Sequence, residues 1–337
     1  MTDKSGKMCL DTTENFVKGM EPHYSEHTES NRNDVRYSEK LLNLHSKAWV
    51  DILKLGSNAG DGQQKRCRDA VKVTDSGIPP LNGMRKDHKK GNFENGPPLR
   101  PLANAGIGPN AALGNIMCRV LRPVREEVRD RHGTEVMNTE EILHKIEAFN
   151  DENGDKDIRV SIPRDCKNDG EIQGREWVCG SMDVAALFPS ITAELSKKYI
   201  MEAFMESKLE FGGIDWEHVI KYVSLNCDRK IFEKYKLNSK IPIPKGTTTL
   251  SSYINNRKDS QFKTKVNIEN FSDKEKHIVL ALAVCVGVET VMGNHYFEFN
   301  NKIYRHSKQD ALGWILLVNW LHYVCLDRIK NLLENAK

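Results

Sequence analysis

The chain has 337 residues, enough for one large lobed domain or two smaller ones. Lys and Arg total 50 and Asp and Glu total 47, which gives a formal net charge of +3. This balance excludes an acidic solvating tail and a histone-like polycation, so any nucleic-acid surface must come from local clustering of charge.

Eight cysteines are scattered along the chain and none forms a CxxC pair. This spacing argues against a zinc ribbon or a secreted disulfide scaffold, and indicates reduced thiols in an intracellular protein. The N-terminus lacks the apolar core of a signal peptide. The longest apolar stretch, residues 311–326, is shorter than the roughly 20 residues of a membrane span. We therefore expect a buried helix there and no membrane contact.

The first part of the chain separates into an arm and a helical region. Residues 1–36 are polar and lack periodicity, which predicts a disordered or loose arm. Apolar residues recur at helical spacing from Tyr37 to Leu55, and a helix-prone stretch covers 111–129. Between them, residues 76–110 are rich in Gly, Pro and Asn and predict a basic loop. We treat 37–150 as one region.

The second part begins after a charged insertion at 151–175. The pattern predicts a short strand at 177–184, and helices over 193–206, 216–235 and 309–335. An irregular charged insertion covers 237–268, within a region that we take to span 176–337. A capping box at Ser272–Glu275 predicts a helix to Met292. Strands at 296–299 and 302–304 flank Asn300-Asn301, which predicts a hairpin.

The run from Ser181 to Ile191 (SMDVAALFPSI) places one carboxylate, Asp183, at the end of an apolar strand. Carboxylate oxygen suits Mg²⁺, and paired ions can clamp the attacking and leaving oxygens of a phosphoryl transfer. The alternative is an Asp that caps a strand-to-helix turn. The whole run resembles motif A of template-directed polymerases, which occurs in B-family DNA polymerases and in reverse transcriptases of Penelope-like retroelements.

Two basic strings lie upstream: GMRKDHK from Gly83 to Lys89, and PLRPL from Pro98 to Leu102. Cations on a Gly- and Pro-stiffened loop can bind triphosphate oxygens or a strand backbone, although a solvated basic loop has the same composition. Their order and spacing resemble the fingers of Penelope-like reverse transcriptases. B-family polymerases have no such region before motif A, so the resemblance favours the reverse transcriptase.

The hairpin and the turn that follows it, through Gly313, resemble the opening of motif B in the same family. His306, Gln309 and the Trp314-Ile315 pair depart from the family pattern, which has Gln, Gly and Ser-Pro there. The Tyr-x-Asp-Asp string of motif C is absent, because the chain contains no Asp-Asp pair. One carboxylate cannot hold two Mg²⁺ ions, so we expect a fragment or decayed copy that is inactive as this chain alone.

The resemblance implies an α+β fold, with the fingers and an incomplete palm of a right-hand polymerase made of an antiparallel sheet and packed helices. It implies a Mg²⁺ site, in which Mn²⁺ could substitute, at Asp183 and the Val184 carbonyl, with Asp183 as the catalytic residue. The other implied roles are substrate binding by Lys86, Arg100, Phe188 and Gly313, and nucleic-acid binding by Arg85, His88, Lys89 and Lys90.

The implied partners are an RNA template, a DNA primer and deoxynucleoside triphosphates. Two alternatives remain open. The chain could be a catalytically inactive nucleic-acid-binding protein derived from a reverse transcriptase, whose binding weakens as salt rises. It could also be an unstable relic with an exposed sheet edge.

Overall fold

A computed structural model describes residues 12–55, 77–86, 98–103, 108–132, 140, 143–145, 147–148, 151, 192–256 and 258–306. The chain divides into two units, of which the first combines Met1–Val128 with Phe188–Lys337 and the second is Arg129–Leu187. The described part is a mixed α+β fold with small antiparallel sheets and packed helices, as the sequence predicts.

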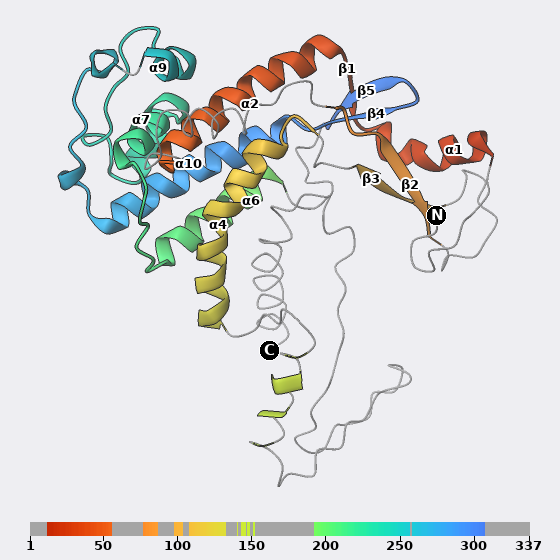
Figure 1. Ribbon diagram of the computed structural model, residues 1–337, viewed down its shortest axis with the longest axis horizontal. Coiled ribbons are helices and arrows are strands. Elements are labelled where there is room, and N and C mark those ends of the chain that lie inside the picture. Colours follow the sequence, from red (N-terminus) through yellow and green to blue (C-terminus); the bar gives the residue numbers. More distant parts are fainter. Residues whose placement is uncertain are drawn as a thin grey trace. The chain divides into compact units, whose positions relative to one another are not determined.

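The described elements are mostly helices, with five short strands near the two ends of the described chain (Figure 1). In chain order they are α1 (Thr13–Tyr24), β1 (Thr28–Ser30), α2 (Arg32–Ile52), β2 (Leu81–Arg85), β3 (Leu99–Ala103), α4 (Ala111–His132), α6 (Ala193–Glu206), α7 (Trp216–Asn226), α8 (Arg229–Lys234), α9 (Leu250–Asn256), the 3₁₀ turns η3 (Asp259–Gln261) and η4 (Ile268–Asn270), α10 (Asp273–Gly293), β4 (Tyr296–Phe299) and β5 (Lys302–Arg305).

Helix α10 is the centre of the helical core. It packs against α6, α7 and α2, and Figure 1 shows it running between α2 and α6. After its charged first turns, α10 is mostly apolar on all sides and most of these side chains are buried, as expected for a helix surrounded by other helices. By length and composition α10 could also cross a membrane, but most of it is buried within the fold, where core helices pass the same test.

Three helices begin or end where local signals predict. Ser272 accepts the Glu275 backbone N–H while the Glu275 carboxylate accepts the Ser272 N–H, so the predicted capping box opens α10. Helix α6 has its predicted bounds, with the Thr192 hydroxyl accepting the Leu195 N–H. Helix α4 begins at Ala111 as predicted and continues to His132.

The predicted loose arm is wrong for residues 12–36. Thr12 caps α1, and β1 pairs with β5 through the Thr28–Arg305 register. Helix α2 begins at Arg32, before the predicted start, because Asn31 and Asp34 form a reciprocal capping box. Polar composition hid these elements, since α1 contributes mainly Met20 and its neighbours to a core supplied by distant strands.

The helix predicted over 216–235 is two helices. Cys227 has extended backbone dihedrals, and the Asp228 carboxylate accepts the Lys230 N–H at 2.9 Å to start α8. A short polar side chain that bonds the backbone competes with helix continuation. The segment 237–268 is largely irregular, as predicted, but it contains α9 and contributes buried Tyr253 and Phe262 to the core.

The predicted hairpin is confirmed. β4 and β5 pair antiparallel, and both turn residues have positive φ, 50° at Asn300 and 59° at Asn301. Asn tolerates this left-handed region better than most residues, which makes it a good turn residue. β1 adds to β5, giving a three-stranded sheet in the order β1-β5-β4.

The segment predicted as a basic loop contains two strands. β2 and β3 pair antiparallel from Leu81–Ala103 to Arg85–Leu99, and the Lys86 N–H extends the ladder to the Pro98 carbonyl at 3.0 Å. The Gly and Pro content of this segment predicted a loop. In the structure Pro101 lies opposite Gly83, and a two-stranded ribbon tolerates the N–H donor that proline lacks. The ribbon joins the three-stranded sheet through the Glu298 N–H, which donates to the Pro79 carbonyl at 2.9 Å.

Candidate nucleic-acid interface

The β2–β3 ribbon brings together the two basic strings that are separated in the sequence. Met84 lies opposite Arg100, and Lys86 follows one residue beyond the last strand pair. Lys86 and Arg100 are therefore diagonal neighbours across the ribbon, and such positions lie about 7–8 Å apart on one face. Arg100 is exposed and Lys86 is partly exposed.

The opposite face of the ribbon is apolar and packs against α1. A Cβ added at Gly83 would lie 2.7 Å from Met20 Sδ and 3.0 Å from Phe16 Cε2, so this strand needs glycine to approach the helix. Arg85 lies opposite Leu99 and shares its face by strand alternation. Among the predicted nucleic-acid contacts, Arg85 is thus on the other face from Arg100.

Helix α1 also binds the ribbon through its C-terminal turn. His23 Nε2 donates to the Leu99 carbonyl at 3.1 Å. Burial lowers the pKa of His23, and the nearby Lys86 charge lowers it further. The imidazole is therefore biased toward its neutral form and adds little positive charge beside Lys86 and Arg100.

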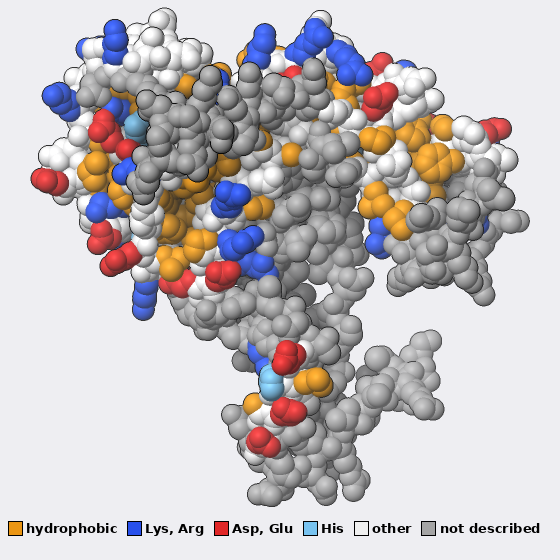
Figure 2. Space-filling model, viewed as in Figure 1, with side chains coloured by type: hydrophobic (Ala, Val, Ile, Leu, Met, Phe, Trp, Pro, Cys, Tyr) orange, Lys and Arg blue, Asp and Glu red, His pale blue; other side chains and the backbone are white. Residues whose placement is uncertain are grey.

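Hydrophobic side chains gather on the visible surface over α1, β2 and β3, and Lys or Arg side chains stand at their border (Figure 2). Leu102, two residues after Arg100, is 41% exposed. An apolar surface with cations beside it can accept a base or sugar together with its phosphate. The described ribbon therefore combines cations that can bind phosphate with an apolar surface that can contact a base or sugar.

The other site residues implied by the resemblance lie outside the described residues. They are His88, Lys89, Lys90, Asp183, Val184, Phe188 and Gly313. Within the described ranges, no group of three or more His, Cys, Asp or Glu side chains is arranged to hold a metal ion. The implied Mg²⁺ site thus depends on residues for which the structure gives no geometry.

A groove of about 610 Å³ lies between α6, the α7–α8 junction and α10, and we name it the α6–α10 groove. Apolar side chains from all three elements line it: Met201, Met205, Ile231, Tyr235, Leu282 and Val286. The charged residues around them include Glu194, Lys197, Lys198, Glu202, Asp228, Lys234 and Glu289. Sequence reasoning did not find this groove, because its walls come from segments far apart in the chain.

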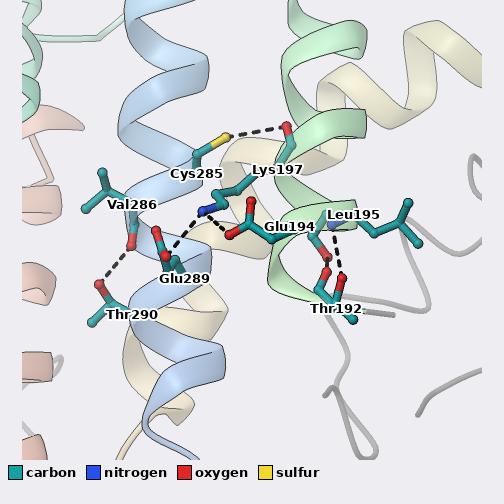
Figure 3. Close-up of polar contacts among 9 residues, drawn as sticks. Thr192, Glu194, Leu195, Lys197, Cys285, Val286, Glu289 and Thr290 are labelled. Carbon is teal, nitrogen blue, oxygen red and sulfur yellow. Dashed lines mark hydrogen bonds and ion pairs between the residues drawn. The ribbon is translucent and has the colours of Figure 1, made fainter. Parts of the chain in front are cut away.

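An ion-pair bridge between α6 and α10 lines one end of the groove (Figure 3). Lys197 Nζ lies 2.7 Å from Glu194 Oε1 and 3.2 Å from Glu289 Oε1. Burial alone would lower the pKa of Lys197, but the two carboxylates outweigh it and the pKa is raised. The lysine therefore stays charged and holds the two helices together at this end.

Two thiols, Cys227 and Cys285, also line the groove. Burial raises the pKa of Cys227 to about 12 and raises that of Cys285 as well. The Cys285 thiol faces the Lys197 carbonyl at 3.7 Å (Figure 3). Neutral buried thiols are poor nucleophiles, so these cysteines act as apolar lining and not as a catalytic thiolate.

Three histidines meet at one end of the three-stranded sheet, a cluster that sequence reasoning missed. The His27 and His306 rings lie 4.1 Å apart, and the His295 and His306 rings 5.6 Å apart. His295 is 2% exposed, and neither of its ring nitrogens has a hydrogen-bond partner among the described residues. Burial and the nearby His27 lower the pKa of His295 to about 4. Acidification is therefore expected to destabilise the fold at this cluster.

Comparisons with protein-family models, with curated proteins and with solved structures find no match to this chain.

Proposed function

We propose that the chain is the fingers and part of the palm of an RNA-directed DNA polymerase of Penelope-like retroelement type. The observation that supports this most is the β2–β3 ribbon, in which the two basic strings pair and Lys86 and Arg100 become neighbours on one face. In the proposal these two side chains bind the triphosphate or strand phosphates, and Asp183 with the Val184 carbonyl holds Mg²⁺.

The binding part of the proposal is testable without turnover. Lys86→Ala and Arg100→Ala should each weaken binding of a fluorescein-labelled RNA–DNA hybrid roughly tenfold, because each removes a charge-assisted contact to phosphate. Each should also reduce the slope of log affinity against log salt by about one. Fluorescence anisotropy over a range of KCl concentrations measures both quantities.

Lys265→Ala is the matched control, since it removes the same charge from an exposed residue away from the ribbon. We expect its affinity and salt slope to equal those of the native chain. Equal losses in all three variants would mean that binding follows net charge alone, and the ribbon would then have no particular role.

A second candidate is a non-catalytic nucleic-acid-binding protein of the same descent, since the basic β2–β3 ribbon could bind phosphate without any metal ion. Asp183→Ala separates the two functions. For a polymerase, the variant should bind the hybrid within about twofold of the native chain and lose deoxynucleotide incorporation on a primed RNA template with Mg²⁺ or Mn²⁺, because metal ligation is needed for chemistry more than for binding.

Three results are informative in that assay. Incorporation by the native chain that Asp183→Ala removes supports the polymerase. Salt-dependent binding by the native chain without incorporation assigns the binding function to this chain, and polymerisation would then require a longer form, since one carboxylate cannot hold two Mg²⁺ ions. Native chain that neither binds the hybrid nor extends the primer contradicts both proposals.

A further inference from the structure

We propose that the α6–α10 groove is the docking site of this chain's own segment 311–326, packed as a helix. The groove has an apolar floor that is open in the described structure, where Met205 is 40% exposed and Met201 is partly exposed. Segment 311–326 is the longest apolar stretch of the chain and needs burial. The point at which the chain leaves the fold, the length of the segment and the charge at one end of the groove favour this occupant.

The chain leaves β5 at the C-terminal end of α10. The His306 N–H donates to the His295 carbonyl at 3.0 Å, and the Arg305 guanidinium donates from Nε and Nη2 to the Gly293 carbonyl at 3.0 and 2.6 Å. Glu289, on the groove wall, precedes Gly293 by about one helical turn, or roughly 6 Å. Residues 307–310 can span about 13 Å, so residue 311 can reach this end of the groove.

The docked helix would cover the whole length of the groove and extend past it. The groove follows α6 from Glu194 to Met205, about 16 Å of helix, and a helix over 311–326 would be about 24 Å long. Entering beside Glu194 and Glu289, the segment runs parallel to α6 and antiparallel to α10. Cys325, about 20 Å along the segment, then lies near Met205.

Charge favours this orientation. Glu194 and Glu289, with Lys197 between them, leave a net negative charge at the end of the groove where the docked helix would begin. The N-terminus of a helix carries a partial positive charge and is stabilised by nearby carboxylates. The reverse orientation would place the negative C-terminal end of the helix against the same two carboxylates.

Docking has a consequence that rests on the proposed function. Helix α6 starts at Ala193, directly after the motif A run, and its capping residue Thr192 stands beside Glu194 (Figure 3). The docked segment would bring Gly313 to this end of α6. The two halves of the polymerase-like sequence, motif A and the motif B-like turn, would thus meet at one end of the groove.

Thiol cross-linking of the full chain tests the docking. Met205→Cys places a thiol at the far end of the groove, where Cys325 should lie within reach. After copper–phenanthroline oxidation, we expect a disulfide between the introduced thiol and Cys325 in the monomer band of a non-reducing gel, identified by mass spectrometry of the digest. Ile243→Cys is the control, because Ile243 is similarly exposed, at 43%, but does not line the groove.

The outcomes are distinct. A link to Cys325 from position 205 and not from position 243 supports docking. No link, or equal links from both positions, overturns it. A link found only in the dimer band means that a second copy fills the groove, which also overturns the proposal. The binding assay with Lys86→Ala tests the ribbon, whereas the cross-linking assay tests the groove. The proposed function and the docking proposal can therefore fail independently.

Discussion

Acidification from pH 7 to pH 4 should lower the free energy of unfolding by about 3 kcal/mol for each of two buried histidines, His45 and His295. Burial lowers the pKa of both from 6.5 to about 4 in the folded protein. As the pH falls, the unfolded chain binds these protons first. Above pH 6.5 these histidines therefore do not reduce the free energy of unfolding. The free energy of unfolding decreases between pH 6.5 and 4, and below pH 4 these two groups cause no further loss.

The two histidines differ in their surroundings. His45 Nδ1 shares a hydrogen bond of 2.6 Å with the Tyr222 hydroxyl, in a core that includes Trp49. His295 has no such partner among the described residues and lies 5.6 Å from the His306 ring. Protonating His295 would place a charge in a buried site without a carboxylate partner, which is costly.

Urea unfolding between pH 7.5 and 4 measures the effect. His295→Phe keeps a ring in the stack and removes the proton site, so its stability should fall by about 3 kcal/mol less than that of the native chain over this range. His144→Phe is the control, because the His144 side chain is 71% exposed. This variant should lose as much free energy of unfolding on acidification as the native chain. A native-like acid loss in His295→Phe would contradict the role given to this residue.

Gly287→Ala should lower the free energy of unfolding by about 1–3 kcal/mol, although alanine favours helix over glycine. Gly287 lies in α10 where three helices meet. An added Cβ would overlap Met117 Sδ and would lie 3.1 Å from Met117 Cε and 3.3 Å from Trp49 Nε1. These side chains are fully buried, so neither can move aside into solvent.

Gly293→Ala is the matched control in the same helix, because nothing lies within 4 Å of its added Cβ. It should be neutral or stabilising by up to about 1 kcal/mol. Chemical denaturation of both variants, and of Gly287→Ala combined with Met117→Ala, measures the clash. The double variant should show a favourable coupling energy, since the smaller side chain makes room for the methyl group. Equal effects of the two glycine substitutions would rule out close packing at Gly287.

Local signals predicted most of the helices and the hairpin. The Ser272–Glu275 capping box, the Thr192 cap and the Asn300-Asn301 turn are formed within three or four residues, so the sequence determines them directly. The same kind of reasoning failed at Asp228, where a competing cap divides a helix. It also failed for α1 and β1, which are ordered by distant partners.

The candidate site was only partly predictable. The sequence identified Lys86 and Arg100 as cations of interest, but it treated the intervening Gly- and Pro-rich stretch as a loop. The strand register that makes them neighbours, and that turns Arg85 to the other face, depends on pairing with a strand more than ten residues away. Such pairing is selected by packing against α1, where Gly83 allows the close approach of Met20.

Sequence alone located the start of several helices and the hairpin turn, and showed that the charge is balanced overall and concentrated locally and that residues 311–326 need burial. Those properties depend on neighbouring residues or on composition. The β2–β3 ribbon, the histidine cluster and the α6–α10 groove became visible only in the folded chain. Each of these joins side chains from distant parts of the chain, and no local pattern specifies such contacts because their free energy arises from packing between elements.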